Sequence, residues 1–249
     1  HWEVRKLRFL VDTIGGMTPN KSEQSFWNGD VPWVSPKDMK YAEIVDSIDH
    51  ITETALEQNN IRLIPHPAVL IVVRGMILAR TFPVAITTVP VTINQDMKAL
   101  LPRKGAVSVD AAYLRHMLSG MGDVVRQLIE ESGHGTRVLR TDLWRNLPAL
   151  VPTPREQEAI CAYVGQLTTT LHQAIDSTRN EIALIREYRT RLVADVVTGK
   201  LDVRGAALGL EDADALSPED PAADLIDDAD GESDTEADGD EAEIAAVEE

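Results

Sequence analysis

The chain has 249 residues, enough for one or two domains, and a formal net charge of −17 that is concentrated in residues 211–249, which hold 18 acidic side chains and no Lys or Arg. Residues 1–210 keep 23 acidic against 24 basic side chains, so a nucleic-acid-binding surface is not excluded. The single cysteine, Cys161, excludes an internal disulfide framework and fits a reducing cytoplasm, and no apolar run approaches the roughly 20 residues that cross a bilayer.

Residues 1–152 are predicted to form one mixed α and β domain. Three runs in it are β-branched, apolar and bounded by Pro, Gly or charged residues, as strands are: Val31–Val34, Ala68–Val73 and Val84–Ile93. The connections between them are rich in Gly, Pro, Asn and Asp. Long connections on a rigid scaffold are where recognition residues usually lie, so binding residues are expected there.

Two helices are predicted in the same domain from their capping residues. Thr52 can cap a short helix that runs to Gln58, and Ser108 can cap a longer one that runs toward Glu131, with an interruption near Gly120. The tryptophans are dispersed among apolar residues, so core packing is favoured over a stacking platform for bases. They are Trp2, Trp27, Trp33 and Trp144.

The strongest helix signal in the chain begins at Thr153. Thr153 can serve as N-cap, Pro154 falls at the first helical position and Glu156 at the third, which together make a capping box. An uninterrupted helical pattern then runs to residue 198, and Gly199 is placed to end it. We therefore predict a spacer helix within residues 153–204, separate from the domain that precedes it.

Apolar side chains along this helix recur mostly three or four residues apart, which indicates a coiled coil with another helix. The predicted partner interface consists of Ile160, Val164, Leu167, Leu171, Ile175, Ile182, Ile185 and Leu192. At 1.5 Å per residue the helix is a rod of roughly 68 Å, which cannot bury its stripe alone. The alternative is packing on the chain's own preceding domain, and the length argues against this for the distal half. Cys161, on the apolar side, is expected to be a packing residue rather than a nucleophile.

Residues 205–249 consist largely of Asp, Glu and Ala. Such a tract cannot bury enough apolar surface to offset its chain entropy, so it is predicted to be disordered. The simplest role for it is that of a solubilising extension. A sharper hypothesis is that the tail competes with DNA for the basic surface of the body and lowers non-specific binding.

Five segments in combination resemble one half of the specificity subunit of type I restriction–modification systems. They are Trp2–Leu7, Gly15–Pro19, Val31–Met39, Leu147–Ile160 and Leu192–Leu201. The resemblance covers residues 2–204, so only the acidic tail lies outside it. It implies an α+β fold, in which a mixed α/β target recognition domain is followed by a long helix that serves as coiled-coil dimerisation element and spacer.

The resemblance also implies a non-catalytic, cytoplasmic subunit that reads one half of a bipartite sequence in double-stranded DNA. Modification (methyltransferase) and restriction subunits would assemble around it. S-adenosylmethionine, ATP and Mg²⁺ would be bound by those partners and not by this chain. The family's subunit usually carries two recognition domains, whereas this chain has one. It would therefore either form a homodimer through the helix or be one half of a longer protein, an alternative that the start at His1 leaves open.

Ten residues are predicted to contact DNA. Arg can hydrogen-bond to guanine through two atoms, Lys can neutralise phosphate, and Asn or Gln can read adenine. The ten are Thr18, Lys37, Lys40, Arg74, Arg80, Asn94, Gln95, His134, Arg137 and Arg140. Each cation can instead be a solvated surface charge, the two amides can equally close a turn after the strand that ends at Ile93, and the loop around His134 can be a plain connector.

Two other functions remain as alternatives. A coiled-coil adaptor without DNA specificity would need only the helix. A metal-dependent nuclease is suggested by Asp38 and Asp96, each of which stands two residues before a lysine, a spacing that is common by chance. The histidines show no metal-ligand spacing, and the chain has neither a phosphate-binding loop nor an Asn-Pro-Pro-aromatic motif. The sequence therefore favours a DNA-specificity module without a catalytic or metal site.

Overall fold

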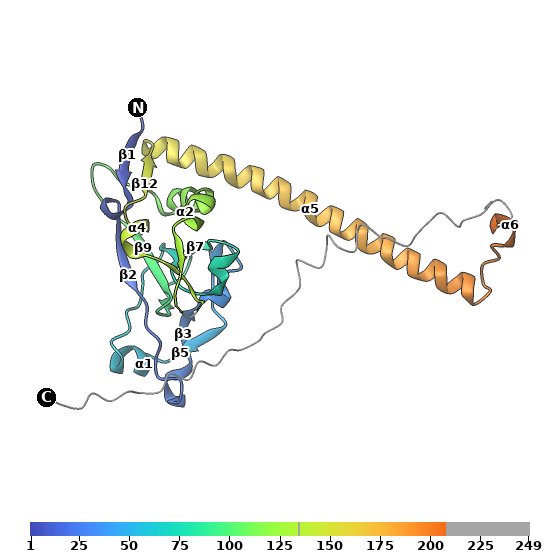
Figure 1. Ribbon diagram of the computed structural model, residues 1–249, viewed down its shortest axis with the longest axis horizontal. Helices are drawn as coiled ribbons and strands as arrows, with labels where there is room; N and C mark the ends of the chain where they lie inside the picture. Colours follow the sequence, from blue (N-terminus) through green and yellow to red (C-terminus); the bar gives the residue numbers. More distant parts are fainter. Residues whose placement is uncertain (134, 208–249) are drawn as a thin grey trace. The chain divides into compact units, whose positions relative to one another are not determined.

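The computed structural model describes residues 1–133 and 135–207. The chain divides into two units between Ser177 and Thr178, inside its long helix. We call residues 1–152 the head. Strands β1 and β12 lie at one end of the head, where the long helix starts, and β3, β5 and α1 lie at the other end (Figure 1).

The larger sheet of the head has five strands in the order β2-β9-β6-β7-β4. Its strands are β2 (Val11–Gly15), β4 (Glu43–Ile44), β6 (Val69–Val72), β7 (Val84–Thr87) and β9 (Met97–Pro102). Neighbours run antiparallel except for β4 and β7, which are parallel. All four residues of β6 are buried, as expected for the central strand of a covered sheet.

A smaller sheet has the order β5-β3-β8 and its own apolar cluster. Its strands are β3 (Trp27–Val34), β5 (Asp49–Ile51) and β8 (Thr92–Ile93). The register between β3 and β5 shifts between Trp27 and Val31, which marks a β-bulge. Trp33 and Ile51 are buried in this cluster, and helix α1 (Glu53–Gln58) packs against it.

Two short ribbons complete the strands of the head. In the first, β1 (Glu3–Lys6) pairs antiparallel with β12 (Pro148–Val151), so the two ends of the head meet. In the second, β10 (Ile129–Glu131) pairs with β11 (Arg137–Leu139) as a hairpin. A bridge between Arg74 and Val138 ties this hairpin to the residues that follow β6.

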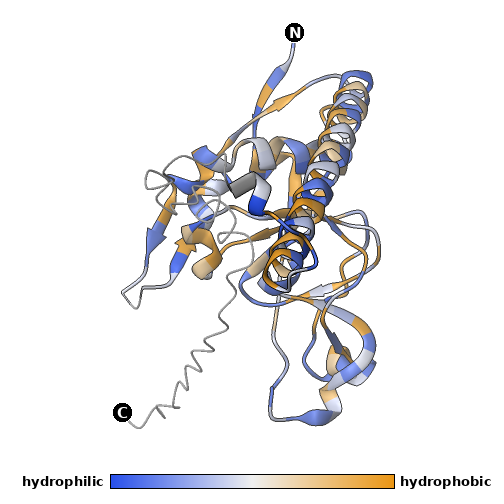
Figure 2. Ribbon diagram, turned by 90° about the vertical axis from the view of Figure 1, so that its right-hand side faces the viewer, coloured by the Kyte–Doolittle hydropathy of each residue, from blue (hydrophilic) through white to orange (hydrophobic). Residues whose placement is uncertain are grey.

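The main core lies between the larger sheet and the helices of the head other than α1. These are α2 (Ala111–Gly120), α3 (Gly122–Arg126) and α4 (Thr141–Trp144), and the 3-10 turns are η1 (Leu7–Phe9), η2 (Gln24–Phe26), η3 (Pro36–Asp38) and η4 (Met76–Ala79). Figure 2 shows apolar residues along the central strands of the head, polar residues on some of the outer strands, and a mixture of the two along α5. Leu70, Leu100 and Leu114 are fully buried, and the burial of each side chain stabilises the folded state by roughly 1.5–3 kcal/mol.

The long helix, α5, runs from Pro154 to Val197 and has 44 residues. The predicted capping box is confirmed, because the Glu156 carboxylate accepts a 2.9 Å hydrogen bond from the Thr153 N–H and the Glu156 N–H donates to the Thr153 hydroxyl at 3.4 Å. Gly199 adopts a φ of +73°, the left-handed conformation of a helix-ending glycine. A short helix α6 spans Arg204–Ala207. Within the two described ranges, no helix is both long enough and apolar enough to cross a bilayer.

Several sequence predictions for the head need correction. The helix expected from Ser108 toward Glu131 is capped by Asp110 instead, and the end of its range forms strand β10. The strand expected over Val84–Ile93 is split into β7 and β8. Core packing is confirmed for Trp33 and Trp144, whereas Trp2 is exposed. The disorder predicted for the acidic tail falls on residues that, from 208 onward, lie outside the described part of the chain.

Candidate nucleic-acid interface

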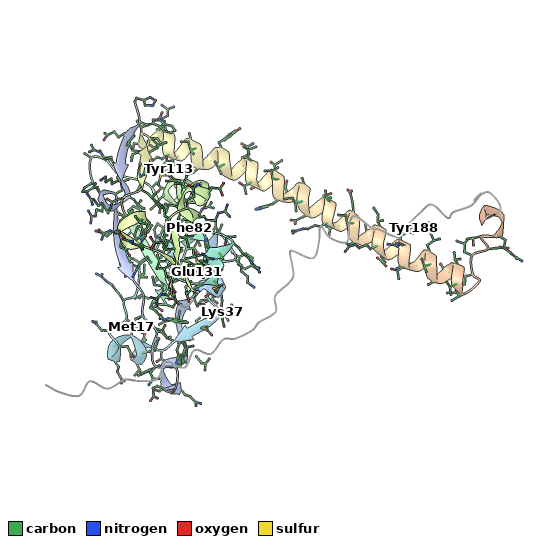
Figure 3. The ribbon with its side chains drawn as sticks, in the orientation of Figure 1. Met17, Lys37, Phe82, Tyr113, Glu131 and Tyr188 are labelled. Carbon is green, nitrogen blue, oxygen red and sulfur yellow. The ribbon has the colours of Figure 1, made fainter. Side chains whose placement is uncertain are left out.

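A cavity of about 560 Å³ lies at the end of the head that holds β3 and β5. Its walls come from the Gly-rich segment after β2, from β3 with the turn that follows it, and from the loop between β8 and β9. The polar groups that line it include Thr18, Lys21, Lys37, Asn94, Gln95 and Asp96. Figure 3 shows Met17 and Lys37 toward this end of the head and Tyr113 toward the end where α5 begins.

The Gly-rich segment lies directly against the loop after β8. A Cβ atom on Gly16 would stand 2.0 Å from the carbonyl oxygen of Asn94, so only glycine allows this approach. The Met17 N–H donates to the Ile93 carbonyl at 2.9 Å, and the Thr18 hydroxyl hydrogen-bonds to the side chain of Gln95. These contacts bring Thr18 and Gln95, which are far apart in the sequence, to one wall of the cavity.

Lys37 is presented by a rigid turn. The buried Asp38 carboxylate accepts hydrogen bonds from the Ser35 N–H at 2.7 Å and from the Ile48 N–H at 2.8 Å. Because main-chain donors occupy both oxygens, this carboxylate is suited to hold the turn and not to bind a metal. Lys37 is exposed on the turn, and Lys40 lies beside a separate cavity of about 440 Å³ that Lys37 also lines.

Asn94 closes the loop that carries Gln95 and Asp96. It is 7% exposed, and its side-chain oxygen accepts a 3.0 Å hydrogen bond from the Asp96 N–H. This is the Asx turn that a buried Asn can form with its own backbone. Of the two amides predicted to read DNA, Gln95 is therefore the exposed one, and Asn94 shapes the loop around it.

Arg74 is bonded through its main chain to Asp96, which lines the cavity, and two further arginines lie on or just after the β10–β11 hairpin. The Arg74 N–H donates to the Asp96 carbonyl at 3.2 Å, and the Gly75 N–H donates to the Arg137 carbonyl at 3.0 Å. On the hairpin Arg137 pairs with Glu131 at 2.8 Å, and just after the hairpin, at the start of α4, Arg140 pairs with Asp142 at 2.7 Å. Two of the predicted DNA contacts are thus engaged by carboxylates, which a phosphate would have to displace.

The predicted contacts do not all converge. Thr18, Lys37, Asn94 and Gln95 line one cavity, and the main-chain bonds above place Arg74 at its border. Arg80 caps the end of η4, where its carbonyl accepts a 3.2 Å hydrogen bond from the Arg126 guanidinium. His134 lies outside the described residues. Sequence reasoning did not place Lys21 and Asp96 at the cavity, since their position follows from the pairing of distant strands.

The start of α5 is fixed by a residue that the sequence did not single out for this role. The Gln157 side chain is 2% exposed and makes three hydrogen bonds. Its oxygen accepts from the Asp110 N–H at 2.7 Å, and its amide donates to the carbonyls of Ser108 at 3.0 Å and Pro152 at 2.9 Å. Gln157 therefore ties the first turn of α5 to the segment that begins α2.

Most of the predicted helix interface is uncovered. Ile160 is partly buried and packs with Cys161 on the core of the head, which confirms a packing role for the cysteine. Val164 is partly exposed. The other six are exposed apolar side chains, namely Leu167, Leu171, Ile175, Ile182, Ile185 and Leu192. An apolar stripe of this kind on one helix is typical of a surface that a partner covers.

The chain thus combines an α+β head, whose cavity is lined in part by Lys, Asn and Gln side chains, with a long helix that carries an exposed apolar stripe. The sequence profile described as "Type I restriction modification DNA specificity domain" matches residues 1–182. The chain belongs to this family.

Relatives in the family are specificity subunits of type I restriction enzymes. That of EcoR124I/EcoR124II from Escherichia coli is 33% identical over 183 residues, which cover 73% of this chain and 45% of the relative. That of MjaIX from Methanocaldococcus jannaschii is 29% identical over 167 residues, which cover 66% of this chain and 37% of the relative. This chain thus spans less than half the length of these curated relatives.

Solved structures share the fold. The HsdS subunit from Thermoanaerobacter tengcongensis aligns over 69% of this chain and 38% of its own, with a TM-score of 0.52 and 18% identity. A chain from a structure of the assembly and conformational transition of the type I R-M system aligns over 78% of this chain and 45% of its own, with a TM-score of 0.60 and 17% identity. The predicted α+β fold with a long C-terminal helix is confirmed.

Proposed function

We propose that this chain is a non-catalytic DNA-specificity subunit that reads one half of a bipartite site in double-stranded DNA. Family membership and the cavity at the far end of the head from α5 carry this proposal. Lys21, Lys37 and Arg74 supply positive charge for phosphates, and Gln95 supplies an exposed amide for a base edge. The head would bind DNA through this end.

The uncovered stripe of α5 supports the second part of the proposal, which is that α5 pairs with another helix and sets the distance between two half-sites. A second copy of this chain or a second half-subunit would supply that helix. Two heads related by a two-fold axis would read a split, pseudo-palindromic sequence, because the symmetry of the protein is mirrored in the DNA.

Modification and restriction subunits would assemble on this scaffold in the cytoplasm. S-adenosylmethionine, ATP and Mg²⁺ would be bound by those subunits. Among the described residues, no group of three or more His, Cys, Asp or Glu side chains is arranged to hold a metal ion. The chain itself would contribute sequence recognition and geometry.

The test is a binding titration of the chain with its methyltransferase partner on duplexes with randomised sequence. We expect enrichment of two half-sites at a fixed separation. Lys37→Ala should weaken binding to all sequences alike and reduce the slope of log affinity against log salt concentration by about 1. The control is Lys6→Ala on β1, at the opposite end of the head, which should change neither the affinity nor the slope. Binding without any sequence preference would contradict DNA reading and favour an adaptor.

A further inference from the structure

Asp96 occupies a position in the cavity that the proposed DNA contacts do not explain. Its carboxylate lines the cavity next to Gln95 and is half-buried. Lys21 and Lys37 line the same cavity, and a negative charge among them opposes the binding of phosphate. A surface built only for phosphate would gain affinity if this residue were neutral.

The backbone of Asp96 is held on both sides. Its N–H donates to the Asn94 side chain at 3.0 Å, and its carbonyl accepts from the Val73 N–H at 2.7 Å and from the Arg74 N–H at 3.2 Å. Three main-chain hydrogen bonds, to a side chain of its own loop and to the residues after β6, leave this residue little freedom. The main chain therefore holds Asp96 at the cavity before any ligand arrives, and only the side-chain torsions remain to be ordered on binding.

The carboxylate itself is poorly satisfied. It accepts one long hydrogen bond, of 3.5 Å, from the Asn94 amide, and none of the ion pairs found among the described residues includes it. Burial raises the pKa of the Asp96 carboxyl, and the positive charge of Arg74 opposes this change. A charged acceptor that is partly removed from water and left without strong donors reduces stability, so a ligand that supplies donors would be bound favourably.

The donors that DNA offers to a carboxylate are the exocyclic amino groups of cytosine and adenine in the major groove. Guanine and thymine present acceptors at the corresponding positions, and an unpaired carboxylate facing them is penalised. We propose that the Asp96 carboxylate accepts a hydrogen bond from the exocyclic amino group of one cytosine or adenine in the half-site and so selects that base. This inference rests on the proposed function, since it requires that the cavity face DNA.

The experiment compares Asp96→Asn and Asp96→Ala with the unaltered chain, each in complex with the methyltransferase partner, on the randomised duplex pool. Discrimination at one base position should fall by roughly 5- to 100-fold, the range for loss of one specific base contact, while preferences elsewhere persist. Asp12→Asn is the matched control. It removes a carboxylate at the far end of β2, where Asp12 pairs with Arg103 at 2.7 Å, and should leave every preference unchanged.

Base analogues then identify the donor. Purine in place of adenine, or 2-pyrimidinone in place of cytosine, lacks the amino group. With the unaltered chain such a substitution at the selected position should cost as much as Asp96→Ala, and the two changes together should cost no more than either alone.

Four outcomes would overturn the inference. One is an unchanged preference in both Asp96 variants. Another is an equal loss at all positions, which would mean that Asp96 only supports the fold. A third is loss of discrimination in the unaltered chain when divalent cations are chelated, which would assign the carboxylate to a metal. The fourth is an unaltered chain that binds without sequence preference, and this outcome alone would also remove the proposed function.

Discussion

At the scale of single residues, Gln157 shows how one side chain can join two parts of the fold. It satisfies one main-chain N–H and two main-chain carbonyls at the start of α5 and before α2. A buried polar group that loses its partner costs about 1–3 kcal/mol, so the contribution of this residue exceeds that of an exposed hydrogen bond.

We predict that Gln157→Leu lowers the thermal stability of the chain. Leucine leaves the Asp110 N–H and the Ser108 and Pro152 carbonyls without their partner, at a cost of about 2–4 kcal/mol, which lowers the melting temperature by roughly 5–15 °C in a domain of this size. Thermal unfolding followed by circular dichroism measures this. Glu158→Leu, at the exposed neighbouring position, is the control and should change the melting temperature by far less.

Asp96 gives a prediction for pH. Because burial raises the pKa of the folded-state carboxyl, the folded protein binds this proton more tightly than the unfolded chain does. The charged form therefore lowers stability at neutral pH, and the loss disappears as the pH falls below the unfolded value of about 4. Asp96→Asn should melt at a higher temperature than the unaltered chain at pH 7, with the difference closing near pH 4. An equal difference in melting temperature at both pH values would contradict a raised pKa of the Asp96 carboxyl in the folded protein.

At the scale of elements, local chemistry predicts α5 well and α2 poorly. The Thr153–Glu156 capping box and Gly199 act within one turn of each end of α5, so a sequence reveals them. The start of α2 depends on a distant residue, because the Ser108 carbonyl is bound by Gln157 while Asp110 caps the helix through the Ala112 N–H at 2.8 Å. Ser108 and Asp110 are both favoured N-cap residue types, so residues 108–131 offer two possible starts for the helix, and the contact that engages Ser108 comes from outside that range.

The split of the Val84–Ile93 run has a similar cause. Pro90 has no N–H for a strand, and Val91 is bridged to Ile64 in a different part of the chain. The two halves of the run then join different sheets, β7 in the larger and β8 in the smaller. Hydrophobic runs indicate that strands exist, whereas the sheet to which each belongs is decided by pairing across the fold.

For α5 we predict that Leu171→Glu abolishes pairing while the head stays folded. Leu171 is 60% exposed, so glutamate disturbs no core contact in the described chain, but it places a charge in the apolar stripe. Light scattering should show a dimer for the unaltered chain and a monomer for the variant, with an unchanged melting temperature of the head. The control is Gln173→Glu, an exposed position off the stripe. A variant that keeps the dimer mass would contradict pairing through this stripe.

At the scale of the whole molecule, the candidate site could be predicted only in part. Residue chemistry selected Thr18, Lys37, Asn94 and Gln95, and the fold gathers them around one cavity. It could not separate them from Arg80, whose place depends on η4, nor could it reveal that Arg137 and Arg140 are paired with carboxylates. The place of Arg80 depends on packing with a distant residue, Arg126, and the two ion pairs depend on the local conformation of the hairpin and of the turn after it, which residue types alone do not specify.

The distribution of charge along the chain gives a further prediction. Deleting residues 211–249 removes 18 acidic residues from a chain whose other 210 residues are nearly neutral. Affinity for non-specific duplex should therefore rise at low salt, and the gain should shrink as salt increases, because the effect is electrostatic. Titration of a non-specific duplex at several fixed salt concentrations measures it. Equal affinities with and without these residues would show that the tail does not compete with DNA.

The antiparallel pairing of β1 with β12 has a consequence for how new specificities can arise. Glu3 stands opposite Val151, so the first and last strands of the head are neighbours. Replacement of the residues between these two positions would exchange the whole head at two adjacent points of the fold, and α5 with its capping box would keep its sequence. If the head reads DNA as proposed, recombination at these points would change the sequence that is recognised and leave α5 unchanged, so a library of grafted heads would test whether specificity moves with the head.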